Sequence, residues 1–382
     1  MAGTRATVRL SSAVARLALA CLASLACGAC VYARIFYFNV PSLAASTYFA
    51  HREVRASSHP IPLRKDELEA QLVLAGDRRE RFGTLDALLA STRTRAFLVL
   101  LDDRIVYERY LGGADAETQL PSFSMSKTFA ALLVGCAIDD GLIGSTDQSI
   151  VDYLPELASK PGYRDVRFDN LLRMNSGIDF AEASVAGAAL YYTTDLRSQL
   201  FAYDVRWKPG TRYLYGGLGI QLIWGALERR LGGRTISSYF EQRVWDRLGA
   251  ASAASWSLDS RAHGVEKLFG GFNATARDHA RLGKLFLDGG QVGGRRLVSN
   301  DWIVRSLEPD PVAGTVPTSE GPMRRGMYQW FLTLDGCCYF SKGYEGQYVF
   351  VDAAKKLVFV RFGEEYGGAD WPALFVGLAS QL

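Results

Sequence analysis

Residues that bind metals or form disulfide bonds are scarce in this sequence. It has 382 residues, of which four are histidine and six are cysteine. Three cysteines lie in one apolar stretch near the N-terminus, and Cys136, Cys337 and Cys338 have neither the spacing of a zinc site nor that of a disulfide framework. No histidine pair has the i, i+4 spacing of a helical metal site; the histidines are His51, His59, His263 and His279. We therefore expect no metal ion.

Signatures of several other protein classes are also absent. The sequence contains no phosphate-binding loop, no dinucleotide fingerprint after a strand and no Gly-x-Ser-x-Gly elbow. The formal net charge is only +3 and no basic run is interleaved with aromatic residues, so we expect no nucleic-acid partner. Hydrophobic residues make up 48% and charged residues 22%, a balance typical of a globular protein with a large core. No organic cofactor is implied.

The N-terminal residues differ in composition from the rest. Residues 17–33 carry no charge, three arginines precede them, and bulky aromatic residues lie at or after their end, namely Tyr32, Phe36, Tyr37 and Phe38. This pattern predicts a signal or membrane anchor over residues 1–35. No clean small-x-small cleavage site ends the run, so we expect an uncleaved anchor that tethers an exported, periplasmic domain to the cell membrane. Cleavage with secretion, lipidation at Cys27, and a buried helix are the alternatives.

The remaining chain, residues 36–382, reads as one α+β domain that begins with a polar, irregular arm over residues 36–80. Short β-rich runs predict an early hairpin at 95–113 and late strands at 327–335, 338–342, 347–353 and 356–363. Apolar periodicity predicts helices at 124–138, 219–233, 276–290 and 370–382.

The simplest arrangement of these elements is a five-stranded antiparallel sheet flanked by helices, with a helical lobe inserted between its strands. The sheet lobe would comprise residues 36–110 and 301–382, and the helical lobe residues 111–300. We expect the functional site where the two lobes meet, because pockets commonly form at such junctions.

One pair of residues at the start of the predicted central helix has the types and spacing needed for nucleophilic catalysis. Ser124 precedes Lys127 by three positions, so both side chains lie on one helix face. A serine hydroxyl is a weak nucleophile until a base accepts its proton. A lysine buried in the apolar helix that follows should have a lowered pKa and can act as that base. Free N–H groups at the helix start could stabilise an oxyanion.

Seven sequence blocks, in order, resemble those of one known family, the serine β-lactamase-related hydrolases, which include class C β-lactamases, esterases and 6-aminohexanoate-dimer hydrolases. The blocks lie within residues 95–365 and read IVYERYLGG, SFSMSKTFAALLVGCAIDDGLI, VDYLPEL, LLRMNSGIDF, PGTRYLYGGLGIQLIWGALE, GGFNATARDHARLGKLFLDGG and GYEGQYVFVD. The resemblance implies the β-lactamase/penicillin-binding-protein fold and a serine hydrolase that works through an acyl-enzyme without a cofactor.

The resemblance also implies roles for individual residues. Ser124 and Lys127 match the family's Ser-x-x-Lys pair, and Tyr215 matches the tyrosine that shares proton transfer with the lysine. Gly343 matches the strand glycine that lines the cleft, and the amide of Tyr344 would be the second oxyanion donor beside that of Ser124.

One position departs from the family pattern. An asparagine usually stands two residues after the tyrosine, and here Gly217 occupies that place. Because this asparagine normally holds the lysine and the substrate amide, its absence argues against recognition of β-lactams and amides more than against acyl transfer. Asn175 or Asn273 could replace it as a substrate-binding residue beside Gly217.

The sequence therefore predicts a serine hydrolase acting on a small-molecule carboxylic ester or short amide, with Ser124 as nucleophile and Lys127 with Tyr215 as its base. Two alternatives stay open. One is a non-catalytic or slowly acylating ligand-binding or sensor protein on the same fold, and the other is a peptidoglycan-directed D,D-peptidase.

Overall fold

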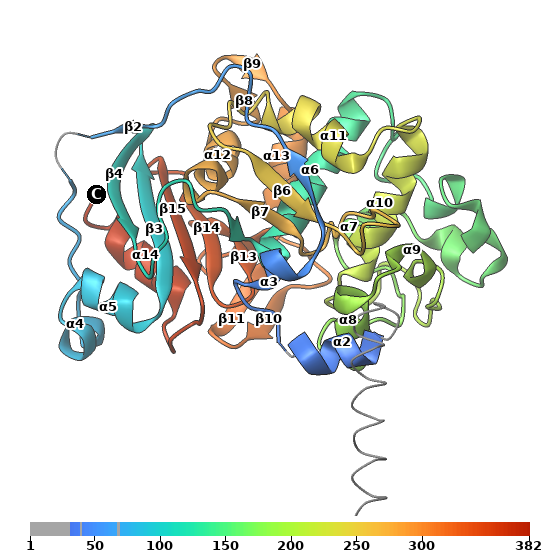
Figure 1. The fold of residues 1–382 in the computed structure, drawn as a ribbon, viewed down its shortest axis with the longest axis horizontal. Helices are drawn as coiled ribbons and strands as arrows, with labels where there is room; N and C mark the ends of the chain where they lie inside the picture. The colour runs from blue at the N-terminus through green and yellow to red at the C-terminus, as the bar shows by residue number, and fades with distance from the viewer. Residues whose placement is uncertain (1–30, 39, 67–68) are drawn as a thin grey trace, which may run out of the picture.

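A nine-stranded sheet forms one side of the structure, on the left in Figure 1. The computed structural model describes residues 31–38, 40–66 and 69–382. Neighbouring strands are antiparallel, except that β2 runs parallel to β4. The strands are, in order across the sheet, β10 (Thr315–Thr318), β11 (Gly321–Arg325), β12 (Phe331–Leu332), β13 (Tyr339–Gly343), β14 (Gln347–Asp352), β15 (Leu357–Gly363), β3 (Thr94–Leu101), β4 (Arg104–Tyr110) and β2 (Arg64–Lys65).

The central strands are apolar on both faces because both faces are covered. Successive residues of a strand point to opposite sides of the sheet. On β15, Phe359 packs in a cluster with α14 (Trp371–Ala379), whereas Val360 packs in the large cluster that includes α12 (Ala276–Leu287). The sheet is thus the middle layer of three.

A second, four-stranded sheet contains the strand that immediately precedes the central helix. Its strands pair in the order β1 (His51–Val54), β6 (Ala254–Ser257), β7 (Phe272–Ala274) and β5 (Leu120–Pro121). β5 continues into the 3₁₀ turn η1 (Phe123–Met125) and then α6 (Ser126–Asp139). Every residue from 126 to 137 is buried, so α6 is the central helix of the molecule.

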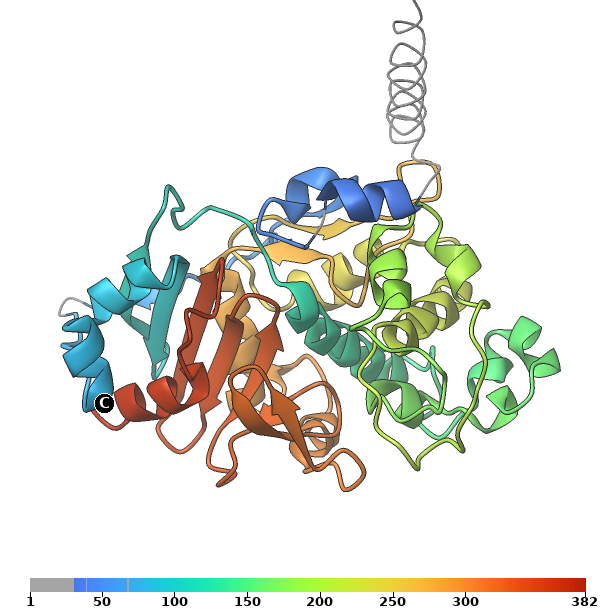
Figure 2. The same cartoon turned by 90° about the horizontal axis from the view of Figure 1, so that it is seen from below.

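The other helices lie at the ends and edges of these sheets (Figures 1 and 2). The N-terminal helices are α2 (Val31–Phe38), α3 (Ala45–Tyr48), α4 (Asp77–Phe82) and α5 (Leu85–Ser91). The later ones are α7 (Phe168–Leu172), α8 (Val185–Tyr192), α9 (Leu196–Gln199), α10 (Leu218–Arg230), α11 (Ile236–Phe240) and α13 (Asn300–Leu307). Phe38 of α2 stacks on Tyr48 of α3, and Figure 2 shows these two helices along one edge of the body.

The predicted α+β class is confirmed, but the predicted number of five strands is too low. The middle of the sheet, β13-β14-β15-β3-β4, is the predicted antiparallel core. The additional strands have short or polar sequences, such as TVPT in β10 and GPMRR in β11, which carry no strand signal. The region predicted to be mostly helix and loop also supplies β5, β6 and β7.

The predicted connecting arm is tied into the body. β1 pairs with β6, and Arg52 on β1 forms an ion pair with the buried carboxylate of Glu266. Glu266 also accepts hydrogen bonds from Trp224 Nε1 at 2.9 Å and from the amide and hydroxyl of Ser237 at 3.0 and 2.9 Å. Arg52 and Glu266 lie 214 residues apart in the sequence, so no local pattern could indicate their ion pair.

The predicted lobe boundaries stay a prediction, with one observation to add. α12 packs on β14, β15 and β3, although a boundary at residue 300 assigns it to the helical lobe. Most of the predicted anchor, residues 1–30, lies outside the described residues. Within the described residues, no helix has the length and apolar character needed to cross a bilayer.

We expect Glu266→Ala to destabilise the protein by about 3–5 kcal/mol, because it leaves the half-buried guanidinium of Arg52 and the buried donors of Trp224 and Ser237 without their acceptor. Urea unfolding measures the change. Glu156→Ala is the matched control: its ion pair with Arg229 is largely exposed, and its loss should cost about 1 kcal/mol or less. Equal losses for the two variants would contradict the role of Glu266.

Candidate active site

Ser124 stands in a strained turn immediately before the central helix. Phe123, the residue before it, has a φ of +46°, a conformation that side chains other than glycine rarely adopt. Two hydroxyls hold this turn against β7. Ser122 Oγ donates to the Phe272 carbonyl at 2.8 Å, and the Phe272 amide donates to Ser126 Oγ at 2.9 Å. The turn therefore presents Ser124 in a defined orientation.

The structure brings the three predicted catalytic side chains together. Lys127 Nζ lies 2.8 Å from Ser124 Oγ, one helical turn away, and 3.4 Å from the Tyr215 hydroxyl, which comes from the loop before α10. The lysine is only 1% exposed. The i, i+3 spacing does place the amine and the hydroxyl within hydrogen-bond reach, as the sequence predicts.

A fourth polar group, the Glu182 carboxylate, also contacts the lysine. Glu182 Oε1 lies 3.1 Å from Lys127 Nζ. Its other oxygen, Oε2, is buried and has no hydrogen-bond partner among the described residues. Sequence reasoning missed Glu182, because it follows the LLRMNSGIDF block in a loop with no recognisable spacing. The one signal that could have indicated another partner for Lys127 was Gly217, because it stands where the family usually has an asparagine that contacts the lysine.

Glu182 reverses the expected ionisation of Lys127. Burial alone would lower the pKa of Lys127, but the Glu182 carboxylate and the Tyr215 oxygen outweigh burial and raise the pKa above its ordinary value. The prediction of a lowered lysine pKa is therefore wrong for this resting site. The raised pKa favours the ammonium form of Lys127, which donates hydrogen bonds to Ser124 Oγ and Glu182 Oε1.

The end of β13 closes on the nucleophile's turn from the other side. A Cβ on Gly343 would lie 2.2 Å from the Ser122 carbonyl oxygen, so only glycine fits there. The amides of Ser124 and of Tyr344, the residue after Gly343, donate no hydrogen bond to any other described residue. Such free amides on either side of a nucleophile are the elements of an oxyanion hole. Ser341, two residues earlier, faces α6 instead, where its hydroxyl lies 2.6 Å from that of Thr128.

A largely apolar cleft of about 790 Å³ opens over Ser124. Aromatic rings make up much of its wall, and Glu182 and Lys342 are its charged residues. Lys342 forms an ion pair with Glu320. The aromatic lining residues are Phe123, Tyr191, Tyr192, Tyr213, Tyr215, Phe269, Phe331, Tyr344 and Tyr366. The cleft suits an apolar group attached to a carbonyl.

The three suggested substrate-binding residues are not among those that line the cleft. Asn175 accepts a hydrogen bond from Asn170 Nδ2 at 3.1 Å within its own loop. Asn273 donates to the Gly271 carbonyl at 3.1 Å inside the small sheet. Gly217 begins α10, and a Cβ there would lie 2.8 Å from the Phe269 side chain. Each of the three thus has a packing or hydrogen-bonding contact outside the cleft lining, and their predicted role in substrate binding stays a prediction.

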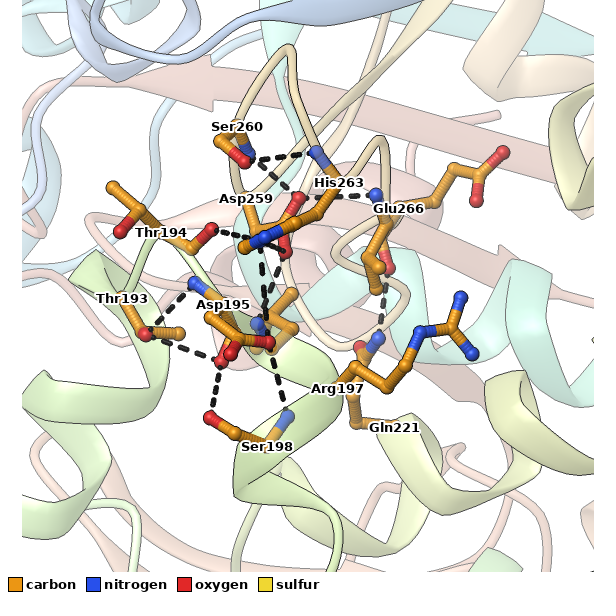
Figure 3. Close-up of polar contacts among 12 residues, drawn as sticks. Thr193, Thr194, Asp195, Arg197, Ser198, Gln221, Asp259, Ser260, His263 and Glu266 are labelled. Carbon is orange, nitrogen blue, oxygen red and sulfur yellow. Dashed lines mark hydrogen bonds and ion pairs between the residues drawn. The ribbon is translucent and has the colours of Figure 1, made fainter. Parts of the chain in front are cut away.

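One group of metal-ligand residue types occurs among the described residues, formed by Asp195, Asp259 and His263 (Figure 3). Its polar atoms already have partners. Asp259 accepts the backbone N–H groups of Leu196 at 3.0 Å and Val265 at 3.0 Å. His263 Nδ1 lies 2.8 Å from the Thr194 carbonyl, which can only accept, so this nitrogen carries a proton. The group joins the start of α9 to the loop after β6.

Comparison with known families agrees with this geometry. The profile of the family described as Beta-lactamase matches residues 84–371. The chain belongs to the beta-lactamase family. The predicted family is thereby confirmed, and with it the prediction of a serine hydrolase of this family.

Relatives of this beta-lactamase family member include hydrolases of amides and esters. It is 28% identical over 310 residues to the 6-aminohexanoate-dimer hydrolase of Paenarthrobacter ureafaciens, covering 76% of each chain. A solved structure from Bacillus anthracis, provisionally assigned as a 6-aminohexanoate-dimer hydrolase, superposes with a TM-score of 0.74 at 19% identity, over 88% of this chain and 92% of that one. A family VIII carboxylesterase superposes with a TM-score of 0.62 at 20% identity, over 81% and 99%.

We expect that restoring the family's asparagine will damage the protein. Gly217→Asn forces a side chain against Phe269, and such overpacking should cost about 1–3 kcal/mol without adding hydrolysis of nitrocefin, a β-lactam. Thermal unfolding and a nitrocefin assay measure both effects.

Gly232→Asn is the matched control for that substitution. No atom lies within 4 Å of a Cβ at Gly232, and asparagine tolerates its positive φ of +58°, so the cost should be about 1 kcal/mol or less. Nitrocefin turnover gained by Gly217→Asn at unchanged stability would contradict this account.

Proposed function

We propose that the protein hydrolyses small-molecule carboxylic esters through an acyl-enzyme on Ser124. The observation that carries this proposal is the contact of Ser124 Oγ with a buried lysine at the foot of an apolar cleft. Ser124 Oγ attacks the ester carbonyl, the alcohol leaves, and water then releases the acid. The amides of Ser124 and Tyr344 hold the oxyanion in both steps.

The proton of Ser124 needs an acceptor, and an ammonium cannot accept it. We infer that Lys127 first passes one proton to Glu182 Oε1, 3.1 Å away, which leaves a neutral amine beside a neutral carboxylic acid. The amine then takes the Ser124 proton as Oγ forms its bond to the carbonyl carbon. Tyr215 gives its proton to the departing alkoxide and regains one from Lys127, 3.4 Å away.

In the second half of the reaction these transfers run in reverse. Water enters where the alcohol left, and Tyr215 with Lys127 takes its proton as the water oxygen attacks the acyl carbon. When the bond between that carbon and Ser124 Oγ breaks, Lys127 returns a proton to Oγ. Glu182 then gives its proton back to Lys127, and the resting ion pair is restored.

Esters fit this site better than β-lactams or peptides. The cleft is mostly aromatic and aliphatic, and an asparagine that could hold an amide is absent at position 217. One relative is named for amide hydrolysis, and another, matched over 44% of this chain, is the lovastatin esterase of Penicillium rubens. Short amides remain within the chemistry, since the acyl-enzyme route is the same.

The Lys127–Glu182 pair also favours a second candidate, a ligand-binding protein that acylates slowly. A lysine held as ammonium would delay the attack by Ser124 if the transfer to Glu182 were costly. The purified protein with p-nitrophenyl butyrate separates the two: steady turnover supports the hydrolase, and a stoichiometric burst without turnover supports the slow binder.

We expect Ser124→Ala to abolish covalent labelling by a serine-directed fluorophosphonate, because the nucleophilic oxygen is gone. Gel fluorescence or intact mass measures the label. Ser184→Ala is the matched control, since Ser184 lines the same cleft but contacts no base, and it should label like the unaltered protein. Persistent labelling of Ser124→Ala would remove Ser124 from the nucleophile's role.

We expect Glu182→Gln to lower kcat/KM at pH 7 by about 10- to 100-fold and to change its pH dependence. Without the carboxylate, the pKa of Lys127 falls, and its neutral form depends on exchange with solvent. Activity should therefore rise with pH across the neutral range, where the unaltered protein should be nearly flat.

Glu182→Asp retains a carboxylate and is the control for that pH profile, which should stay nearly flat. A merely structural role of Glu182 predicts a different result, namely an equal loss of activity at every pH for Glu182→Gln. That outcome would overturn the proton transfer to Glu182.

A further inference from the structure

The outer face of α2 carries three aromatic side chains that nothing in the described structure covers. Tyr32, Phe36 and Tyr37 are 65%, 90% and 67% exposed. Tyr32 and Phe36 are one helical turn apart, so these two rings share a side of the helix. Tyr37 is the next residue after Phe36. Isolated exposed apolar residues are ordinary, but three large rings within one eight-residue helix form a patch of the kind that marks an interaction surface.

The inner face of the same helix is fixed to the wall of the active-site cleft. Phe38 stacks on Tyr192 of α8, with ring centroids 5.8 Å apart, and on Tyr48 of α3 at 4.6 Å. Arg34 Nε donates to the Tyr192 carbonyl at 2.9 Å. Because Tyr192 itself lines the cleft, these contacts fix the position of α2 relative to the active site. Figure 2 shows α2 at the edge of the body, beside the helical region.

The chain that leaves α2 forms part of the cleft's mouth. Val40 and Pro41 line the cleft, and Val40 is 55% exposed. On the α8 side, Val185 is 67% exposed and lies between the lining residues Ser184 and Gly187. An exposed apolar side chain thus lines the cleft at Val40, and another, Val185, belongs to the segment of α8 that lines it.

The sequence before α2 indicates what this face contacts. Residues 17–33 carry no charge and end within α2, so an uncharged run leads directly into the helix that bears the exposed rings. Aromatic residues that follow such a run favour the boundary between the hydrocarbon and the head groups of a bilayer. The one charged side chain of α2, Arg34, is bonded to Tyr192 and does not interrupt the aromatic face.

We propose that α2 lies in the surface layer of a lipid bilayer and that the active-site cleft opens onto it. The substrates would then be carboxylic esters with long apolar chains dissolved in the membrane. The proposed substrate class depends on the hydrolase function proposed above. The proposed position of α2 in the bilayer does not depend on that function. An apolar cleft whose mouth touches the bilayer lets such a chain reach Ser124 without crossing water.

The position of α2 can be tested without any catalysis. The full chain is reconstituted in phosphatidylcholine vesicles with the photocrosslinking substitution Phe36→p-benzoylphenylalanine. We expect illumination to yield an adduct with the mass of phosphatidylcholine. The matched control, Val304→p-benzoylphenylalanine, sits on exposed α13 and should yield none. A crosslinked dimer would assign the face to a second copy of this chain, and that result, or no lipid adduct, overturns the proposal.

The substrate class is tested by a ratio of two activities in the same vesicles. p-Nitrophenyl palmitate dissolves in the bilayer and p-nitrophenyl acetate stays in water. The combined substitutions Tyr32→Ser, Phe36→Ser and Tyr37→Ser should lower the palmitate-to-acetate ratio at least tenfold while sparing acetate hydrolysis. The control combines Val73→Ser, Val304→Ser and Leu334→Ser, which are exposed residues outside the cleft lining, and should not change the ratio.

The outcomes separate failure of this inference from failure of the proposed function. Acetate turnover that disappears in Ser124→Ala, together with an unchanged ratio in the α2 variant, rejects membrane-dissolved esters but keeps the hydrolase. A lipid adduct at position 36 without turnover of either ester keeps the membrane face and rejects the hydrolase.

Discussion

The amino group of Lys127 holds the candidate site together, because the other side chains that take part in the proposed proton transfers all contact it. It is almost fully buried, and it is shared by the hydroxyls of Ser124 and Tyr215 and the carboxylate of Glu182. A cation without a counter-charge would be unstable at this depth, so the carboxylate is a condition of the arrangement as well as a participant in it. In the proposed mechanism, the same pairing requires that the first step moves a proton from Lys127 to Glu182.

The fold supplies these groups from separate parts of the chain and limits how far each can move. Hydrogen bonds to Phe272 of β7 hold the turn that bears Ser124, and the end of β13 approaches that turn so closely that only Gly343 fits. Both contacts connect the proposed nucleophile, Ser124, to sheets rather than to loops. Groups that are held in place in this way need little reorganisation energy when the transition state forms.

Much of this architecture could be predicted from local sequence. The Ser124–Lys127 spacing, the apolar central helix and the β-rich runs of the late strands are each visible within a few residues, and the blocks of the family pointed to Tyr215 and Gly343. The features that escaped prediction depend on contacts far apart in the chain. Glu182 reaches the lysine from 55 residues away, and Arg52 reaches Glu266 across 214. The direction of the Lys127 pKa shift was wrongly predicted for the same reason. The apolar helix sequence indicated burial of the lysine, whereas nothing near it in the sequence indicated the Glu182 carboxylate.

Phe123 joins the N-terminal helices to the nucleophile. Its strained backbone is retained while its side chain packs beside Ala45, Phe49 and Tyr192. Ala45 and Phe49 belong to the stretch around α3, and no disulfide bond between described residues secures this stretch. A protease cut between α2 and β1 would therefore loosen the packing that holds this turn in its unfavourable conformation. Limited proteolysis at the edge of the molecule could in this way switch off the reaction at its centre, with every catalytic side chain still present.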